Sequence, residues 1–388
     1  MIARVTRRSV LRTTSAAAVA ALLSRRFAAA DENETVIPFV EPQAWDPKKP
    51  AVHWDALTPD QWITPDEQVF TVGHYKPFPT IDPAAYKLGI EGLVANPRTL
   101  TLEQLKSLPK KQITATLECS GNGAGKTFLG AIANTRWTGT PLATLLKECG
   151  IQPEAVEVAF WGADKGKEKI REQEYEQNFA RTLSIADAMK DDVLLAWEMN
   201  GRPLAPGHGF PVRLIVPGYF GIAWVKWLGR IELRDRRLMN RFTARDYVII
   251  RSEPRPDGTT AWKESAVGPI DVKSVVARVT RRKDGTVVIS GAAWADSAGV
   301  KSVEVKIDNG PWQPATISRD HDEPNTWRFW TFQWDHAKPG EHTLVSRAID
   351  NRGRVQPASD DPAIKTKNPK TYWEANAQWP RQIVIQNA

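Results

Sequence analysis

The sequence predicts an α+β protein in which a mixed α/β domain is followed by an all-β, immunoglobulin-like sandwich. A length of 388 residues suggests two or three domains. Residues 61–255 alternate short helix and strand patterns, whereas residues 271–388 show strand patterns only. A proline-rich stretch separates these two regions and predicts a linker at residues 256–270. Hydrophobic residues make up 41% and charged residues 25% of the chain, which excludes wholesale disorder.

The first 30 residues look like an export signal. Arg7-Arg8 precede a short apolar stretch that ends at Leu23, and three alanines at 28–30 precede an acidic segment. A paired arginine, a short apolar segment and small residues at a cleavage site are typical of the bacterial twin-arginine route. The apolar segment is too short to span a bilayer stably, which makes a membrane anchor the weaker interpretation. We therefore expect a periplasmic protein that is exported already folded and has no membrane span in its mature form.

The net charge belongs mainly to this signal. The formal charge is +7, but residues 1–30 hold six arginines and no acidic residue, which leaves +1 for residues 31–388. A nearly neutral body does not imply a phosphate-binding surface, so we expect no nucleic-acid partner. Residues 31–60 are rich in proline and acidic residues and have little periodicity, so they predict an extended N-terminal arm.

Three short helices are predicted in the first domain from signals at their ends. Thr101 and Ser184 each begin a capping pattern. Thr140 would cap another helix with Pro141 in its first turn, and Gly150 would end that helix. The same domain contains runs of strand length at 113–117, 192–199 and 212–216.

Strands dominate the second domain. Apolar and charged residues alternate from 303 to 307, and Asp-Asn-Gly at 308–310 then turns the chain. Residues 327–334 form an aromatic-rich strand pattern, and residues 342–349 form another. Strands at short intervals over about 110 residues predict the sandwich, here without the paired cysteines of antibody domains.

The two cysteines have different surroundings. In an exported chain one disulfide between Cys119 and Cys149 is the simplest interpretation. Cys149, however, ends the predicted helix and is then a packed thiol. Cys119 precedes Ser-Gly-Asn-Gly-Ala-Gly at 120–125, and such a glycine cluster favours close approach of the backbone to a bound group.

Four basic residues lie beside glycines and prolines in apolar surroundings: His74, His208, Arg213 and Lys226. Each alone has an ordinary structural explanation, such as a hydrogen-bonded core histidine or a lysine whose stem covers apolar surface. Together with Cys119 they could hold a large anionic cofactor, with cations on a phosphate and a soft thiolate on a metal.

Cys119 lies in the segment Thr-Leu-Glu-Cys-Ser-Gly-Asn-Gly at 116–123, which resembles the cysteine motif of the sulfite oxidase family of molybdenum enzymes. Further segments resemble this family in its own order: 134–139, 194–201, 208–213, 216–218, 225–228, 245–247, and in the C-terminal part 291–294, 308–312, 347–350 and 356–357. The resemblance spans about residues 62–386.

The resemblance implies a fold, a cofactor and a reaction. The fold would be a sulfite-oxidase-type molybdopterin domain at 61–255 followed by a dimerisation-type domain at 271–388, which allows a homodimer. The cofactor would be a mononuclear molybdopterin whose metal is held by the pterin dithiolene, oxo groups and Cys119. The reaction would oxidise sulfite to sulfate by oxygen-atom transfer at molybdenum, followed by one-electron re-oxidation.

The resemblance also implies roles for individual residues. Those that would contact the pterin or its phosphate are His74, Ser120, His208, Arg213 and Lys226. Cys119 and Tyr247 would be catalytic, the first as the molybdenum ligand and the second through hydrogen bonds near the oxo group and the substrate. The sequence contains no Cys-x-x-Cys-His motif for haem attachment, so no haem is expected and electrons would pass to an external cytochrome c.

The sequence departs from the family pattern where the substrate would bind. Val72 replaces a family arginine, and Gly123-Ala124 stands where the family often has an arginine pair. A desolvated sulfite dianion needs cationic or hydrogen-bonding partners. Lys76 and Lys126 are candidates to supply them, although either lysine could be a solvated surface residue, and Trp137 is a further candidate substrate contact.

Three functions therefore stay open on the sequence alone. The first is a periplasmic sulfite dehydrogenase. The second keeps the cofactor but acts on sulfane sulfur, an S-oxide or another small molecule. The third is an exported, non-catalytic binding or scaffold protein whose active site has decayed.

Overall fold

The structure is a computed structural model that describes residues 34–44, 46, 48–58, 60–123, 130–361 and 375–386, with the backbone alone at 251–254. The predicted export signal at 1–30 lies outside the described residues, as do Ala124 and Lys126. No helix in these described ranges has the length and apolar character needed to cross a membrane.

Two five-stranded sheets build the first domain. One is antiparallel and has the order β10-β8-β5-β4, with β9 (Arg202–Pro203) added beside β8. Its main strands are β4 (Lys111–Glu118), β5 (Ile132–Pro141), β8 (Leu194–Met199) and β10 (Arg213–Ile215). The other has the order β3-β2-β11-β6-β7 and contains one parallel pair, β2 with β11. Its strands are β2 (Lys87–Gly92), β3 (Arg98–Thr101), β6 (Glu157–Ile170), β7 (Gln173–Ser184) and β11 (Leu228–Arg234).

The helices are short, and the predicted signals begin them. The capping box of Thr101 is present at α2 (Leu102–Lys106), and Ser184 caps α4 (Ile185–Ala188). The remaining helices are α3 (Leu142–Cys149), α5 (Arg241–Ala244) and the 3-10 turns η2 (Trp54–Ala56), η3 (Asp66–Gln68), η4 (Pro206–His208) and η5 (Gly221–Ala223). The N-cap of α3 is Pro141 rather than the predicted Thr140, because Thr140 and Pro141 are still paired with β8 as the last residues of β5. The Thr140 hydroxyl donates to the Leu105 carbonyl. Gly150 ends α3 with a positive φ of 70°, as glycine readily does.

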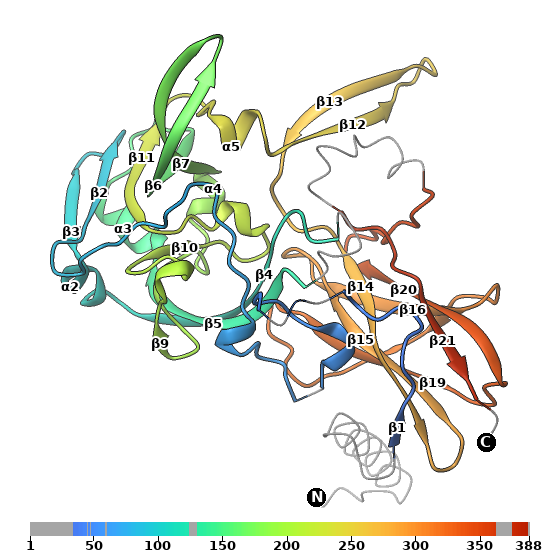
Figure 1. The fold of residues 1–388 in the computed structure, drawn as a ribbon. Helices are drawn as coiled ribbons and strands as arrows, with labels where there is room; N and C mark the ends of the chain where they lie inside the picture. Colours follow the sequence, from blue (N-terminus) through green and yellow to red (C-terminus); the bar gives the residue numbers. More distant parts are fainter. Residues whose placement is uncertain are drawn as a thin grey trace, which may run out of the picture.

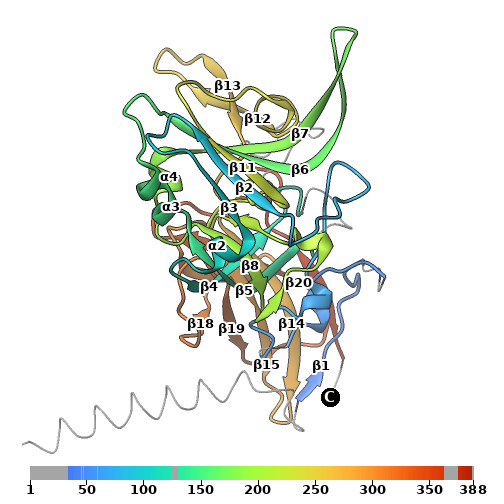
Figure 2. The same cartoon turned by 90° about the vertical axis from the view of Figure 1, so that its left-hand side faces the viewer.

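Two β-hairpins project from the body of the protein (Figures 1 and 2). One is the long β6–β7 pair, and the other joins β12 (Val248–Pro254) to β13 (Thr260–Ala266). The stretch predicted as a linker, 256–270, thus holds the turn and second strand of the latter hairpin. Its Pro-Asp-Gly signal is a hairpin turn, in which the Asp257 carboxylate accepts hydrogen bonds from the backbone and hydroxyl of Thr259.

The second domain consists of two sheets that share one hydrophobic core. The first sheet contains, in spatial order, β1 (Glu34–Val36), β14 (Lys273–Arg282), β15 (Val287–Trp294), β19 (Arg328–Trp334) and β18 (Thr316–Ile317). The second contains β17 (Gln313–Pro314), β16 (Val300–Ile307), β20 (Gly340–Asp350) and β21 (Arg381–Ile385). Ile289 and Trp330 of the first sheet pack in the same cluster as Val305 and Leu344 of the second. The strands predicted at 303–307, 327–334 and 342–349 are all present.

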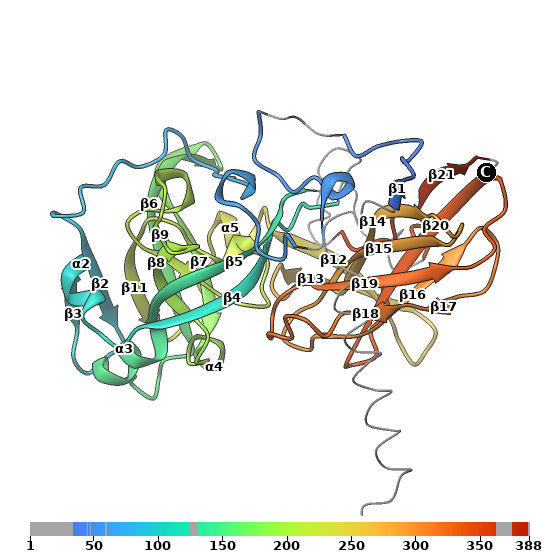
Figure 3. The same ribbon diagram turned by 90° about the horizontal axis from the view of Figure 1, so that it is seen from below.

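Part of the predicted N-terminal arm packs against the rest of the protein, with Phe39, Val52 and Trp54 buried while Val36 and Val40 are exposed. Its first described residues form β1 in the second domain, and Trp54 stacks on Trp294 with ring centroids 5.6 Å apart. Trp62 and Trp327 exchange hydrogen bonds, each ring nitrogen donating to the other's carbonyl. In Figure 3 the blue arm crosses from one domain to the other. The two domains therefore share buried aromatic contacts, and the segment that ends at Cys119 lies close to both.

Candidate active site

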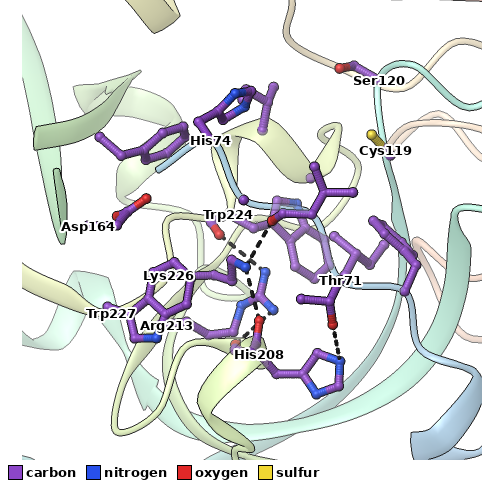
Figure 4. A pocket seen from close by; sticks show the side chains of 18 of the residues that line it. Thr71, His74, Cys119, Ser120, Asp164, His208, Arg213, Trp224, Lys226 and Trp227 are labelled. Carbon is purple, nitrogen blue, oxygen red and sulfur yellow. Dashed lines mark hydrogen bonds between the residues drawn. The ribbon is translucent and has the colours of Figure 1, made fainter. Parts of the chain in front are cut away.

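One pocket gathers most of the polar residues that the sequence singled out. It has a volume of about 650 Å³ including its solvent-open part, and it lies where residues 70–74, the end of β4 and the loops around β10 converge (Figure 4). The predicted site residues that line it are His74, Cys119, Ser120, His208, Arg213, Lys226 and Tyr247. These residues come from segments up to 173 positions apart, such as His74 and Tyr247. The predicted cofactor-binding set is therefore brought together by the fold.

Cys119 enters the pocket from a tight turn at the end of β4. Its N–H donates to the Ala131 carbonyl, and its own carbonyl accepts from the N–H of Asn122 at 2.8 Å. Burial is the main cause that raises the pKa of the Cys119 thiol to about 11. A neighbouring cation such as a metal ion would favour the thiolate. Both cysteines are free thiols, so the disulfide interpretation is wrong, and Cys149 is a buried thiol on α3 as its helix signal indicated.

Three basic side chains lie at the other end of the pocket. The Arg213 guanidinium donates to the carbonyls of His208 and Trp224 at 3.1 and 3.2 Å. Lys226 Nζ donates to the carbonyls of Val72 and Gly207 at 2.9 and 3.0 Å. Burial, together with the nearby Arg213 charge, lowers the pKa of Lys226 to about 7. An anion bound here would restore the full charge of the lysine, since opposite charges favour the ionised form.

Four buried polar atoms of the pocket-lining residues have no hydrogen-bond partner among the described residues. They are Ser120 Oγ, Asp164 Oδ1, His208 Nδ1 and Arg213 Nε. Buried polar atoms are nearly always paired, so four orphans around one pocket indicate a bound polar molecule. His208 Nε2 faces the Val69 carbonyl, which accepts its proton, so Nδ1 of the neutral imidazole is an acceptor. The guanidinium donor, the imidazole acceptor, the hydroxyl and the carboxylate together suit a large heterocycle that has both hydrogen-bonding edges and a phosphate.

Asp164 is a pocket residue that the sequence did not predict. It lies on β6 next to alternating lysines and glutamates, a pattern that indicates an exposed strand, yet its side chain is buried in the pocket wall. Burial raises the pKa of Asp164 to about 6, and the nearby Lys226 opposes that rise. The sequence carried no local signal for this position, because the burial comes from the contact of β6 with the β10–β11 loop.

His74 and Tyr247 form a hydrogen-bonded pair in the pocket. The Tyr247 hydroxyl lies 2.8 Å from His74 Nε2, and the His74 ring stacks on Phe179. Burial first, and then the Arg241 charge, lowers the pKa of His74 to about 4, so the imidazole is neutral near pH 7. Burial and the nearby Cys119 raise the pKa of the Tyr247 phenol. Tyr247 is thus a protonated phenol that can donate a hydrogen bond.

A clamp of four residues, Tyr75, Glu168, Arg241 and Asp246, holds the chain on both sides of this pair. Glu168 accepts from the Tyr75 hydroxyl at 2.7 Å and from Arg241 at 2.6 Å. The Arg241 side chain also donates to Asp246. Tyr75 follows His74 in the chain and Asp246 precedes Tyr247, so the clamp fixes both backbones relative to β6.

The predicted substrate contacts have different outcomes. Lys76 is exposed and does not line the pocket, and its ammonium lies 5.2 Å from the Phe78 ring. Trp137 is fully buried behind the wall, with the Arg213 guanidinium 5.0 Å from its ring. It does not line the pocket, and its buried ring nitrogen has no hydrogen-bond partner among the described residues, so its role as a substrate contact stays a prediction. Val72, in contrast, lines the pocket and is 41% exposed.

Comparisons with known proteins agree with this site. The molybdopterin binding domain of oxidoreductases matches residues 75–242, and the Mo-co oxidoreductase dimerisation domain matches residues 264–378. Mitochondrial sulfite oxidase of Drosophila melanogaster is 32% identical over 332 residues, which cover 78% of this chain and 56% of that protein. Sulfite oxidase of Gallus gallus is 32% identical over 335 residues, which cover 79% of this chain and 70% of that protein.

A solved structure is also similar. The sulfane dehydrogenase SoxCD from Paracoccus pantotrophus superimposes with a TM-score of 0.69 and 27% identity, covering 92% of this chain and 91% of that one. The chain spans only 56–58% of the length of the mitochondrial relatives. Both domains are nevertheless matched, and the pocket lies in the first of them. The chain therefore belongs to the sulfite oxidase family of molybdopterin oxidoreductases.

Proposed function

We propose that this protein is a periplasmic, molybdenum-dependent sulfite dehydrogenase that passes electrons to an external cytochrome c. The observation that carries the proposal is the pocket itself, which brings together a thiol, His208, Arg213, Lys226 and four polar atoms without a partner in the described part of the chain. The kinship to sulfite oxidases supports sulfite as the substrate. A decayed scaffold would have no need to keep such a costly set of buried polar groups unpaired.

The residues of the pocket fit a molybdopterin. Cys119 would be the soft ligand of the metal, and Arg213 and Lys226 would neutralise the phosphate. His208 would contact the cofactor as a neutral imidazole, because burial and then the Arg213 charge lower its pKa. Asp164 and Ser120 would pair with polar edges of the pterin. When bound, the molybdenum centre supplies the oxygen-atom transfer and the one-electron steps of re-oxidation.

The chain's own contribution is to bind, orient and exclude water. In the His74 tautomer protonated at Nε2, the neutral imidazole donates to the Tyr247 oxygen, and the phenol O–H would then donate to an oxygen of the substrate near the metal. Apolar side chains of Leu117, Phe179 and Ile222 line the same pocket and limit the water around the reacting atoms. Low polarity there strengthens the hydrogen bond that Tyr247 donates.

A second candidate keeps the cofactor and replaces sulfite with sulfane sulfur, an S-oxide or another small molecule. The observation in its favour is Val72, an apolar residue at the open side of the pocket, and the structural similarity to a sulfane dehydrogenase supports it. An apolar residue at that place offers no charge to a free dianion.

Activity assays on Val72→Arg separate the two candidates. If sulfite is the substrate, wild-type protein reduces cytochrome c with sulfite, and the added guanidinium lowers the KM for sulfite. If sulfane sulfur or another molecule is the substrate, wild-type protein shows no sulfite-dependent reduction, and Val72→Arg leaves the activity toward the native substrate unimproved.

Three further properties belong to the proposal. The export signal in the sequence supports a periplasmic location by the twin-arginine route, and the dimerisation-domain match supports a homodimer. The two packed sheets of the second domain support an immunoglobulin-like topology. Size-exclusion chromatography with light scattering measures the oligomeric state, and fractionation of the native host measures the location.

A further inference from the structure

The turn that carries Cys119 touches the second domain through a buried ion pair. Glu118 is the last residue of β4, and Lys273 is the first residue of β14. Lys273 Nζ lies 2.6 Å from Glu118 Oε1, and the two side chains are 6% and 0% exposed. Neither residue lines the Cys119 pocket, so any effect of the pair on that pocket passes through the turn.

Hydrogen bonds extend this ion pair around the whole turn. Glu118 Oε2 accepts from the Trp294 ring nitrogen at 2.8 Å, and Oε1 also accepts from the Asn122 amide at 3.0 Å. Lys273 donates a second bond, 3.0 Å long, to the Asn122 carbonyl. The Asn122 side-chain oxygen accepts from the N–H of Ala131, whose carbonyl accepts from the N–H of Cys119. Hydrogen bonds therefore connect both ends of the turn at 119–122, and two of the donors, Lys273 and Trp294, belong to the second domain.

This arrangement does more than hold the domains together. A buried ion pair gives little net stability compared with well-packed apolar residues, because both charges must be desolvated. What such a pair does supply is one fixed geometry, since any shift leaves a charge unpaired in a dry environment. Here the geometry that it fixes is that of the turn from which Cys119 projects.

We propose that Lys273 and Trp294 of the second domain are positioning residues that, through Glu118 and Asn122, set the direction of the Cys119 sulfur. The inference rests on the proposed cofactor at Cys119 but not on the identity of the substrate. The second domain would then be part of the active-site framework as well as a candidate surface for dimerisation.

Lys273→Met tests the proposal, and Arg381→Met is its matched control. Arg381 is equally buried and pairs with Asp55 of the N-terminal arm at 2.7 Å, far in sequence from the turn. Lys273→Arg is the conservative variant, because a second cavity beside Lys273 leaves room for the longer side chain.

Two measurements do not depend on turnover. The first is hydrogen exchange of a peptide covering 117–123, measured on protein with or without cofactor. The second is the Mo(V) electron paramagnetic resonance spectrum of chemically reduced protein. We expect at least tenfold faster exchange and shifted g values in Lys273→Met. In Arg381→Met and in Lys273→Arg, the exchange rate should stay within twofold of wild type and the g values should not shift.

The proposal is overturned if Lys273→Met and Arg381→Met lower the melting temperature alike while exchange and g values in Lys273→Met match wild type. If Lys273→Met does not fold, Glu118→Gln together with Lys273→Met removes both charges at once, and the same two readouts decide. A wild-type protein without molybdenum would refute the proposed function, whereas the exchange result would still decide whether the second domain orders the turn.

Discussion

Glu168 offers a way to disturb the His74–Tyr247 pair without touching the pocket. Its carboxylate is buried to 9% exposure and receives bonds from Tyr75 and from Arg241, whose side chain is 32% exposed. Glu168→Gln keeps the size of the side chain and removes the charge that Arg241 faces. A hydrogen bond to a charged group contributes about 1.5–3 kcal/mol. Because water partly reaches Arg241, we expect the free energy of unfolding to fall by an amount near the lower end of this range, about 1.5 kcal/mol. This corresponds to a decrease of roughly 3–6 °C in melting temperature.

The pH dependence of this loss has a definite sign. Burial raises the pKa of Glu168, but the hydrogen bonds from Tyr75 and Arg241 outweigh it and hold the pKa below its ordinary value. A lowered pKa in the folded state contributes stability above the unfolded pKa, about 4.3 for glutamate, and loses it as the pH falls further. The stability difference between wild type and Glu168→Gln should therefore be complete at pH 7 and shrink below about pH 4.

Urea unfolding at several pH values measures that difference, and turnover at pH 7 measures its consequence for the site. We expect kcat to fall about tenfold, because small misplacements of reacting groups reduce rates strongly. The matched control is Glu174→Gln on the same hairpin, which breaks an exposed pair with Lys167 and should change neither quantity measurably. A Glu168→Gln protein that loses stability but keeps wild-type kcat would refute the positioning role. If Glu168→Gln and Glu174→Gln had the same stability, the buried pair of Glu168 and Arg241 would contribute no more than the exposed pair, which would refute its assigned stabilising role.

Three further substitutions test individual roles in the pocket. Cys119→Ser should abolish turnover and lower molybdenum content, because a hydroxyl is a poor ligand for a soft site, while the melting temperature changes by less than about 3 °C. A serine variant that still turns over would contradict the assignment of Cys119 as the metal ligand. Tyr247→Phe should reduce kcat by about 10²-fold with cofactor content unchanged, as for loss of one preorganised donor; loss of the pterin instead would make Tyr247 a binding residue. Lys226→Met should lower bound pterin per chain at least tenfold, measured by fluorescence of the oxidised pterin, and full retention would remove Lys226 from the phosphate site.

Much of the site was accessible from the sequence because its members stand beside glycines and prolines in recognisable order. His208, Arg213 and Lys226 all lie in short motifs, and the structure places all three around one pocket with Cys119. Local signals also predicted the starts of α2 and α4 and the long strands of the second domain, since capping and alternation depend on near neighbours.

Features that depend on distant contacts were not accessible. Asp164 was hidden because its strand alternates charges like an exposed hairpin, and only its contact with a loop some 60 residues later buries it. Trp137 stood in a family-like motif, yet packing places its ring behind Arg213. The partner of Glu118 is Lys273, 155 positions away, and no periodicity links them.

The central claim, a molybdopterin held by Cys119, is tested most directly by the amount of molybdenum per chain after expression in a cofactor-competent host. The same sample should be assayed for sulfite-dependent reduction of cytochrome c. We predict close to one molybdenum per chain in wild type and a marked loss in Cys119→Ser. A well-folded wild-type protein that carries no molybdenum from such a host would contradict the claim.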